Sequence, residues 1–433
     1  MQKNSLKTGT PESWSKRDEQ LVWHPFSPLV GEGPIMIEKG EGPYLFTPDG
    51  RKIIDAISSW WVNIHGHGRK EIAEAIAAQA MKLEQVIFAG FTHEPAVKLA
   101  EGLQEILPKA HSKIFFSDNG STSVEVGLKM ALQFWHNIGQ KRTRIVAMEG
   151  AYHGDTFGAM AVGDRGAFSE PFHPYLFEVD FIPYPAGHND EEVIEAFRKL
   201  AKSGEIAAFI FEPLLQGSAG MRAYPPALLD ILMQICQEND IITIADEVMT
   251  GFGRTGKIFA TDYLDHAPDI ICMSKGITGG FLPLGVTSCS GHIEDAFRTS
   301  DKSKTFYHGH SYTANPLACA AAVASLDILL SEQCTRDRLR IYHQHELFAE
   351  RMRDHSKVSR VRHLGTVVAF EVNTPEQTGY MNKVRDTLYK EFMDRDVLLR
   401  PLGNVVYILP PYVISNEDLD KVYNAVEEVL EKI

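Results

Sequence analysis

An aspartate and a lysine each end an apolar, strand-like run of this sequence. Asp246 closes IITIAD (241–246), and Lys275 closes DIICMSK (269–275). A carboxylate that emerges from an apolar run needs a cationic or protonated partner, because burying it alone is costly. A lysine that is desolvated at a sheet edge has a lowered pKa and becomes nucleophilic toward carbonyl groups. In isolation either residue is commonly an ordinary salt-bridged side chain, so a chemical role requires further groups nearby.

A candidate phosphate site follows a third strand-like run, KIFFSD (113–118). Asn119-Gly120-Ser121 predicts a tight turn, after which Ser121 or Thr122 can cap a helix. The free N–H groups and the dipole at a helix N-terminus suit a phosphate dianion, although a plain capped helix has the same pattern. Pyridoxal phosphate needs a phosphate cup, a lysine that traps its aldehyde and an acid that keeps its ring nitrogen protonated. Taken together, the three features indicate pyridoxal 5'-phosphate as the cofactor.

The spacing of these residues suits one edge of an open α/β sheet, where ligands bind beyond the carboxyl ends of the strands. About thirty residues separate Asp246 from Lys275, which is enough for one crossover to a neighbouring strand. Tyr152 follows another run, RIVAM (144–148), so its ring can stack on the pyridine.

The stretch GFGRTGK (251–257) matches two nucleotide-binding patterns. The P-loop pattern fails because Ile258 stands where a Ser or Thr must ligate magnesium. The dinucleotide fingerprint requires a strand directly before the first glycine and a helix directly after it. Here the candidate strand stops at Asp246, and Pro268 interrupts the residues after the stretch. We interpret the stretch as a glycine-rich turn whose glycines permit close backbone approach.

Composition limits the class of protein. The 433 residues predict a large domain and a smaller one, and the formal charge of -14 argues against nucleic acid or an anionic membrane as the main partner. Five scattered cysteines, an odd number without a C-x-x-C pair, predict neither a disulfide framework nor a zinc knuckle. No stretch approaches the roughly 18 apolar residues of a membrane span, and the N-terminus lacks the apolar region of a signal peptide. We therefore expect a cytoplasmic protein without a membrane segment.

The chain divides by pattern into a large α/β region and a small α+β domain formed by both termini. Strand-like runs alternate with helical patterns over 71–330, which predicts a parallel sheet with helices on its faces in the large domain. Residues 1–70, with the hairpin PYLFTPDGRKIID, add strands to the small domain of residues 331–433. The runs that we identify as strands or helices of the large domain are 113–118, 144–148, 206–213, 241–246, 269–275 and 284–290 (strands), and 71–86 and 315–330 (helices).

Several motifs resemble those of the class III, fold type I aminotransferases, from about Trp23 to Tyr412. These motifs are DNGSTSVE, GAYHGDTFGAMAV, EPLLQG, IADEVMTGFGRTG, MSKGITGG, HGHSYTANPLACAAA and RPLGNVVYILPPY. The resemblance implies a pyridoxal phosphate enzyme of α/β class. It would have a large domain with a mostly parallel, seven-stranded sheet, a small α+β domain and a homodimer that shares its active sites.

The resemblance also implies roles for individual residues. Lys275 would form the Schiff base and shuttle the proton, Asp246 would pair with the pyridine nitrogen, and Tyr152 would stack on the ring and border the substrate. Gly120 and Ser121 would hold the phosphate, joined by His310 and Ser311 of the second subunit. An oxo-acid substrate would contact Trp60, Trp61, the Gly309 backbone, Arg400 and Tyr407, with Phe26, Asp155 and Arg254 nearby. Independently of the family, the planar fork of an arginine matches a carboxylate, and two indoles can wall the methylenes of a long substrate.

The subfamily that the chain most resembles aminates 8-amino-7-oxononanoate in biotin synthesis, with S-adenosylmethionine as the amino donor. Two positions depart from its pattern. Phe26 replaces a tyrosine, which removes a hydroxyl from the substrate side, and His310-Ser311 replaces Pro-Thr, which keeps a hydroxyl for the phosphate. The first change leaves lysine open as an alternative donor.

Other interpretations stay open. The chain could be another class III aminotransferase that acts on ω-amino acids, or a silent member of the fold used for binding, although a silent member is expected to lack Lys275 or Asp246. The pairs His65/His67 and His308/His310 have the spacing of strand metal ligands, but no acidic or cysteine motif accompanies them. We interpret them as turns beside the cofactor and expect no metal.

Overall fold

The computed structural model describes residues 9–31, 33–166 and 168–433. Its centre is a seven-stranded sheet in the order β4-β12-β11-β10-β7-β5-β6. Strand β12 runs antiparallel to both of its neighbours, and every other adjacent pair is parallel, which confirms the predicted mostly parallel sheet. The strands are β4 (His111–Ser117), β5 (Arg144–Met148), β6 (Asp180–Ile182), β7 (Ile206–Phe211), β10 (Ile242–Asp246), β11 (Ile270–Met273) and β12 (Gly285–Ser290).

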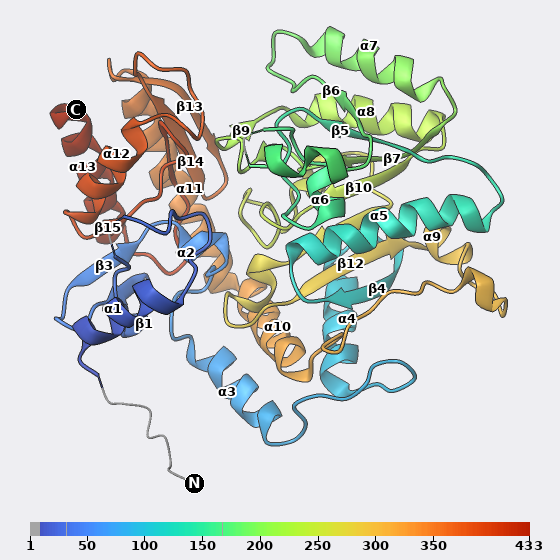
Figure 1. Cartoon of the computed structure of the whole chain (residues 1–433), viewed down its shortest axis with the longest axis horizontal. Helices are drawn as coiled ribbons and strands as arrows, with labels where there is room; N and C mark the ends of the chain where they lie inside the picture. Colours follow the sequence, from blue (N-terminus) through green and yellow to red (C-terminus); the bar gives the residue numbers. More distant parts are fainter. Residues whose placement is uncertain (1–8, 32, 167) are drawn as a thin grey trace.

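Side chains on the central strands are buried on both faces, as a parallel sheet between helices requires. In β10, Ile244 packs into the cluster that contains the apolar side of α5 (Gly120–Asn137), whereas Ala245 packs into the opposite cluster with α8 (Pro226–Glu238). In Figure 1, α5 crosses the sheet on one side. This burial on two faces explains why the strands appear in the sequence as continuous apolar runs.

Further helices surround the sheet and link it to the rest of the chain. Helix α10 packs against α3 and α4 near the end of β11. The remaining helices of the large α/β region are α3 (Lys70–Ala80), α4 (Glu94–Ile106), α6 (Phe157–Ala161), α7 (Asp190–Ala201), α9 (Gly291–Asp295) and α10 (Pro316–Leu329), with 3-10 turns η1 (Glu170–Tyr175), η2 (Ala260–Tyr263), η3 (Lys275–Thr278) and η4 (Lys302–Lys304). The short element α2 (Ser58–Trp61) precedes them and contains residues with non-helical dihedral angles.

The helix predicted over 71–86 ends early, because α3 stops at Ala80. The Asn315 side-chain amide donates to the Glu84 carbonyl at 3.1 Å, and the Gln85 amide donates to the Ser311 carbonyl at 2.8 Å. These bonds tie residues 84 and 85 to a distant loop, so tertiary contacts override the local pattern.

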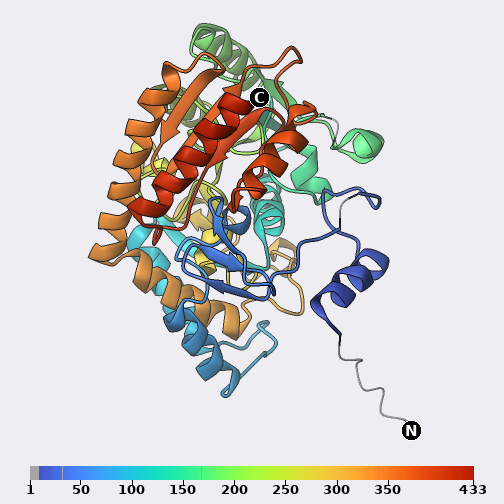
Figure 2. The same cartoon turned by 90° about the vertical axis from the view of Figure 1, so that its left-hand side faces the viewer.

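The two ends of the chain meet in a second sheet. Strands β1 (Lys39–Glu41), β2 (Tyr44–Phe46) and β3 (Lys52–Asp55) are antiparallel, which confirms the predicted hairpin, and β3 pairs in parallel with β15 (Val397–Leu398). Figures 1 and 2 show these blue N-terminal strands beside red C-terminal elements. This pairing supports the division into 1–70, 71–330 and 331–433 that we propose.

The C-terminal region adds a three-stranded antiparallel sheet in the order β13-β14-β16 and its covering helices. Its elements are α11 (Glu332–Arg353), β13 (Val358–Leu364), β14 (Val367–Val372), α12 (Val384–Met393), β16 (Val405–Ile408) and α13 (Asn416–Lys432), while α1 (Pro11–Leu21) lies at the other end of the chain.

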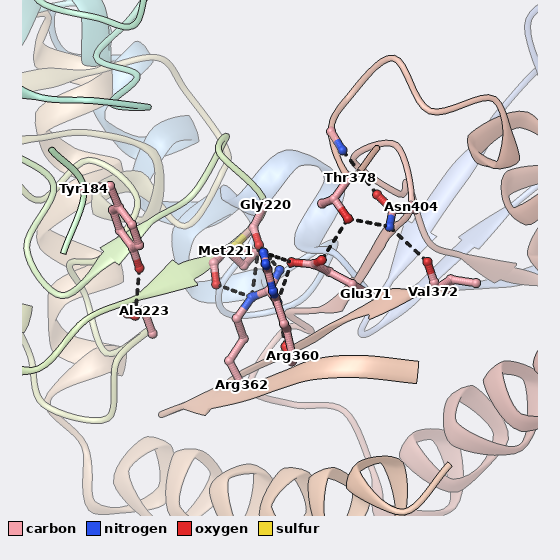
Figure 3. Close-up of polar contacts among 11 residues, drawn as sticks. Tyr184, Gly220, Met221, Ala223, Arg360, Arg362, Glu371, Val372, Thr378 and Asn404 are labelled. Atoms are coloured by element: carbon pink, nitrogen blue, oxygen red, sulfur yellow. Dashed lines mark hydrogen bonds and ion pairs between the residues drawn. The ribbon is translucent and has the colours of Figure 1, made fainter. Parts of the chain in front are cut away.

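A partly buried arginine joins this sheet to the large α/β region (Figure 3). Arg362 of β13 donates through Nε to the Met221 carbonyl at 2.7 Å and through its guanidinium to the Gly220 carbonyl, while Glu371 of β14 lies 3.5 Å from its NH1. Gly220 and Met221 belong to the hairpin of β8 (Leu215–Gln216) and β9 (Arg222–Ala223). Arg362 of the C-terminal sheet therefore holds this hairpin in position.

Within the described part of the chain, no single helix is long and apolar enough to span a membrane. Helices α10 and α11 reach the length and apolar composition of a membrane span only when they are counted as one pair, and that pair is bent by 68°.

Candidate active site

A cavity of about 530 Å³ lies at the carboxyl ends of the central strands. The neighbouring strands β10 and β11 bring Asp246 and Lys275 to it, and the start of α5 brings Gly120 and Ser121. Its other walls include Trp61, Tyr152, His153, Gly154, Asp155, Glu212, Ser218, Ser274 and Thr278. The strand ends singled out in the sequence thus converge on one site.

Lys275 has an unusual backbone. Strand β11 ends at Met273, and Lys275 then adopts φ 45°, in the left-handed region that side chains other than glycine rarely enter. Such strain costs about 1–3 kcal/mol and persists where the surroundings enforce it, most often at functional sites. The amine lies 4.6 Å from the centre of the Trp61 ring. Burial lowers the pKa of Lys275 to about 8, against the opposing effect of the Asp246 and Glu212 carboxylates.

The partner that Asp246 requires is His153, which sequence reasoning missed although it stands in the GAYHGDT motif. Both side chains are buried, and His153 Nδ1 lies 2.7 Å from Asp246 Oδ2. Because a carboxylate accepts hydrogen bonds, Nδ1 carries the donated proton. The Val248 N–H donates to Asp246 Oδ1 at 3.1 Å. The carboxylate is therefore held in one orientation at the cavity wall.

The residue that caps the start of α5 differs from the prediction, in which Ser121 or Thr122 was the capping residue. Asn119 is the N-cap: its side chain accepts the Thr122 N–H at 2.9 Å, and the Thr122 hydroxyl accepts the Asn119 N–H at 3.1 Å. The sequence misled because Asn, Ser and Thr all cap well. Among the described residues, the N–H groups of Gly120 and Ser121 have no hydrogen-bond acceptor, so they stay free beside the cavity.

Glu212 is a second residue that sequence reasoning did not single out. It follows β7, is buried, and accepts the Tyr152 N–H at 3.0 Å and the Gly217 N–H at 2.9 Å. Burial raises the pKa of Glu212 to about 7. Burial also raises the pKa of the Tyr152 hydroxyl well above its usual range, and nearby Asp155 adds to that shift. The signal in the sequence was a carboxylate at the end of the apolar run IAAFIFEP.

An aromatic cluster lies next to the cavity. The Trp61 Nε1–H donates to the Tyr407 hydroxyl at 3.1 Å. The Arg400 guanidinium lies 5.2 Å from the centre of the Trp60 ring, and the Phe26 ring lies 5.4 Å from Trp60 in an edge contact. Phe26 and Trp60 are both exposed, whereas Trp61 and Tyr407 are buried. The structure thus brings together five of the six side chains that the resemblance gave to the substrate, and the sixth, Tyr152, lines the cavity itself.

The predicted residues Gly309, His310 and Ser311 do not border this cavity. They lie between Phe306 and the start of α10, and Gly309 and Ser311 are exposed. Arg254 also lies outside the cavity wall: it is buried, donates to the Pro410 carbonyl at 2.8 Å, and lies 5.1 Å from the centre of the Tyr412 ring. Its charge nevertheless contributes to the lowered pKa of Lys275.

GFGRTGK is a turn that opens no helix, as the interpretation of close backbone approach requires. Gly253 has φ 97°, and a Cβ on it would lie 2.6 Å from the Arg338 side chain. The neighbouring Thr366 N–H donates to the Arg254 carbonyl at 2.9 Å.

The paired histidines bind other protein groups. His65 Nε2 lies 3.0 Å from the Ser325 carbonyl, and His67 Nε2 lies 2.8 Å from Asp55. His308 Nδ1 accepts from Lys129 at 3.0 Å. Across the described residues, no group of three or more His, Cys, Asp or Glu side chains could hold a metal ion.

The fold and this site belong to a known class of protein. The family model described as aminotransferase class-III matches residues 27–430, so the chain belongs to the class III aminotransferases.

The relatives are more specific. The chain is 48% identical to the adenosylmethionine-8-amino-7-oxononanoate aminotransferase of Synechococcus elongatus, over 95% of this chain and 99% of that protein. The crystal structure of the adenosylmethionine-8-amino-7-oxononanoate aminotransferase of Methanocaldococcus jannaschii superposes with a TM-score of 0.92 at 34% identity, over 98% of this chain and 99% of that one. An amine transaminase from an uncultivated Pseudomonas species, in its PLP-bound form, has a TM-score of 0.88 at 29% identity, over 95% and 98% of the two chains. These likenesses confirm the predicted fold type.

Proposed function

We propose that this chain is a pyridoxal 5'-phosphate-dependent aminotransferase that converts 8-amino-7-oxononanoate to 7,8-diaminononanoate in biotin synthesis, with S-adenosylmethionine as the amino donor. The observation that carries the proposal is the convergence of Lys275, Asp246 and the first turn of α5 on one cavity. Similarity to proteins named for this reaction supports the choice of substrate.

The residues around the cavity fit the cofactor. Gly120 and Ser121 offer free N–H groups to a phosphate, and the helix dipole favours negative charge there. Gly154 packs directly against Ser121, because a Cβ on this residue, whose φ is 132°, would lie 2.1 Å from Ser121 Oγ. Asp246 offers a fixed carboxylate to a ring N–H, and Lys275 offers an amine with a lowered pKa.

When bound, pyridoxal phosphate supplies an electrophilic aldehyde and an electron-withdrawing ring that carry the amino group from donor to acceptor. Lys275 Nζ removes the proton from the carbon that bears the donor amine and returns one to the carbon that is aminated. Asp246, oriented by His153, would keep the nitrogen of the cofactor ring protonated. The side chain of Tyr152, whose backbone N–H is held by Glu212, would stack on that ring.

The aromatic cluster suits the acceptor, which carries a carboxylate at the end of an aliphatic chain. Arg400 binds that carboxylate through its planar fork, and Tyr407 lies close enough for the charge of Arg400 to act on its hydroxyl. Trp60 and Trp61 wall the methylenes, so that the oxo carbon faces Lys275. S-adenosylmethionine carries a sulfonium and an adenine, which the faces of Trp60 and Phe26 can receive by cation–π and stacking contacts.

We further propose a homodimer in which His310 and Ser311 complete the phosphate site of the second subunit and the Gly309 backbone borders its substrate. In support, this segment lies away from the cavity of its own chain. Mixing inactive Lys275→Ala chains with Ser311→Ala chains tests the arrangement. Composite sites predict that the mixed dimers gain one site without either change. An active monomer in light scattering would contradict the dimer.

The reaction is tested one half at a time. The holoenzyme is mixed with S-adenosylmethionine, L-lysine or an ω-amino acid, and the absorbance of the bound aldehyde form of the cofactor is followed. We expect S-adenosylmethionine to convert it, and 8-amino-7-oxononanoate to restore it with formation of 7,8-diaminononanoate. If the absorbance responds only to ω-amino acids, the proposed function is wrong.

A further inference from the structure

The segment that carries both tryptophans is strained. Ser58, Ser59, Trp60 and Trp61 have φ values of 51°, 57°, 146° and 71°, all in the region that favours glycine. Each such residue costs about 1–3 kcal/mol and persists only where its surroundings over-determine it. The free energy for holding four of them in succession must come from contacts outside the segment.

Asp55 supplies two of those contacts, both to Ser59. It ends β3 and is fully buried, and its carboxylate faces the strained segment. Oδ1 accepts the Ser59 N–H at 2.9 Å and the Ile57 N–H at 3.4 Å, and Oδ2 accepts the Ser59 hydroxyl at 2.7 Å. The Ser58 hydroxyl adds a bond to the Leu409 carbonyl at 2.9 Å.

His67 holds Asp55 from the other side. Its Nε2 lies 2.8 Å from Asp55 Oδ2 and must donate, because the carboxylate only accepts. Its Nδ1 then accepts from the Asn63 side-chain amide at 2.8 Å. The His67 backbone is fixed by a pair of bonds with Gly42, at 2.7 and 3.0 Å. Gly40 lets the imidazole pass, since a Cβ there would lie 2.7 Å from the His67 Cβ. Both ring nitrogens of His67 are thus used within the protein.

The positions of Trp60 and Trp61 follow from this network. The backbone of the strained segment directs Trp60 to Arg400 and Trp61 to Lys275 and Tyr407. Without the Asp55 bonds, Ser59 and Trp60 can relax to ordinary φ values, and both indoles then turn away from the substrate. We propose that Asp55 and His67 are positioning residues that hold the tryptophan wall in place for the long-chain oxo-acid. This proposal rests on the proposed function for the identity of the substrate.

The test compares variants of His67 in the holoenzyme. His67→Leu removes both ring nitrogens, whereas His67→Gln retains one donor for Asp55 and one acceptor for Asn63. We expect His67→Leu to raise the acceptor KM about 10- to 100-fold, the range for a lost hydrogen bond to a charged group. Cofactor stoichiometry and the donor half-reaction should change little, and His67→Gln should recover most of the loss. His65→Gln is the matched control, because His65 bonds to Ser325 and not to Asp55.

A second readout separates this proposal from the proposed function. Calorimetry measures the affinity for nonanoate, a carboxylate with the same aliphatic length and no reacting group. If the wild type fails to aminate 8-amino-7-oxononanoate but His67→Leu still weakens nonanoate, the proposed function is wrong and the positioning role stands. If His67→Leu lowers only the melting temperature, and neither KM nor nonanoate affinity changes, the positioning role is wrong. Should His67→Leu fail to fold, Ser59→Ala removes one Asp55 bond and must raise KM about 3-fold for the proposal to hold.

Discussion

The Arg400 guanidinium lies over the Trp60 ring, 5.2 Å from its centre. A cation on an indole face is held in orientation while its N–H groups remain free for a carboxylate. Arg400 is only partly exposed, so a carboxylate that reaches it exchanges water for a bidentate contact. This pair gives the site a fixed anchor at the end of the tryptophan wall.

Removal of that anchor should damage one half-reaction. Arg400→Ala leaves the far carboxylate of the acceptor unpaired, at a cost of about 2 to 4 kcal/mol in acceptor kcat/KM. The donor half-reaction should suffer less. Single-turnover absorbance with each substrate measures both. Arg400→Lys keeps the charge without the fork and should recover only part of the loss. Equal losses for donor and acceptor would contradict this assignment.

His153 should matter for catalysis although it bonds only to Asp246 among the groups described. His153→Phe leaves a buried carboxylate without its charged hydrogen bond, and we expect kcat to fall about 10- to 100-fold. The measurements are kcat and the absorbance of the bound cofactor. His111→Gln serves as control, because His111 is also buried but bonds to Ser288 and Pro268, away from the cavity. A similar fall in kcat for both variants would indicate a general loss of packing.

The sequence predicted which strand-end residues line one cavity, and the reason is physical. Asp246, Lys275 and Gly120 stand beside apolar runs, where a polar residue is conspicuous, and parallel strands bring such positions to one edge. The six predicted runs all overlap strands of the sheet. The seventh, β6, has only three residues, Asp180–Ile182, and follows a 3-10 turn, so its pattern is too short to stand out.

The sequence could not show which polar residues meet across the fold. His153 follows β5 whereas Asp246 ends β10, and Asp55 ends β3 whereas His67 lies 12 residues further along the chain. The positive φ values of the SSWW segment could not be predicted either, because glycine is the residue type that indicates such a conformation and this segment has none. The N-cap of α5 was ambiguous for a simpler reason: three neighbouring residues can each cap a helix.

Cofactor uptake should depend on pH through Lys275. Burial lowers the pKa of its amine from 10.5 to about 8, and only the neutral amine can bond an aldehyde. The rate of pyridoxal phosphate uptake by the cofactor-free protein should therefore rise about tenfold per pH unit below pH 8 and level off above it. Stopped-flow absorbance measures the rate. A plateau that persists to pH 6 would contradict the lowered pKa, and Lys275→Ala should show no covalent uptake at any pH.

The same shift affects the stability of the cofactor-free protein. Between about pH 8 and 10.5 the unfolded chain binds a proton on Lys275 that the folded chain does not. The contribution of Lys275 to the free energy of unfolding should therefore increase with pH across this window. Comparison of urea unfolding for the wild type and Lys275→Met isolates the contribution, because the variant has no titrating amine at this position. An identical pH slope for the two proteins would contradict it.

The donor prediction depends on Phe26, whose exposed ring contacts the edge of Trp60 at a centroid distance of 5.4 Å. Phenylalanine keeps an aromatic face for a sulfonium or an adenine but offers no hydroxyl. Phe26→Tyr should therefore speed the S-adenosylmethionine half-reaction about 3- to 10-fold, the effect of one added neutral hydrogen bond. Phe26→Ala should slow it, because the face is lost, and the acceptor half-reaction should respond less to either change. Single-turnover absorbance with S-adenosylmethionine and with L-lysine measures all three proteins.

An unchanged rate in Phe26→Tyr would mean that the hydroxyl does not set donor use. If lysine converts the cofactor and S-adenosylmethionine does not, the proposed donor is wrong, while the anchor at Arg400 and the proposed acceptor are unaffected.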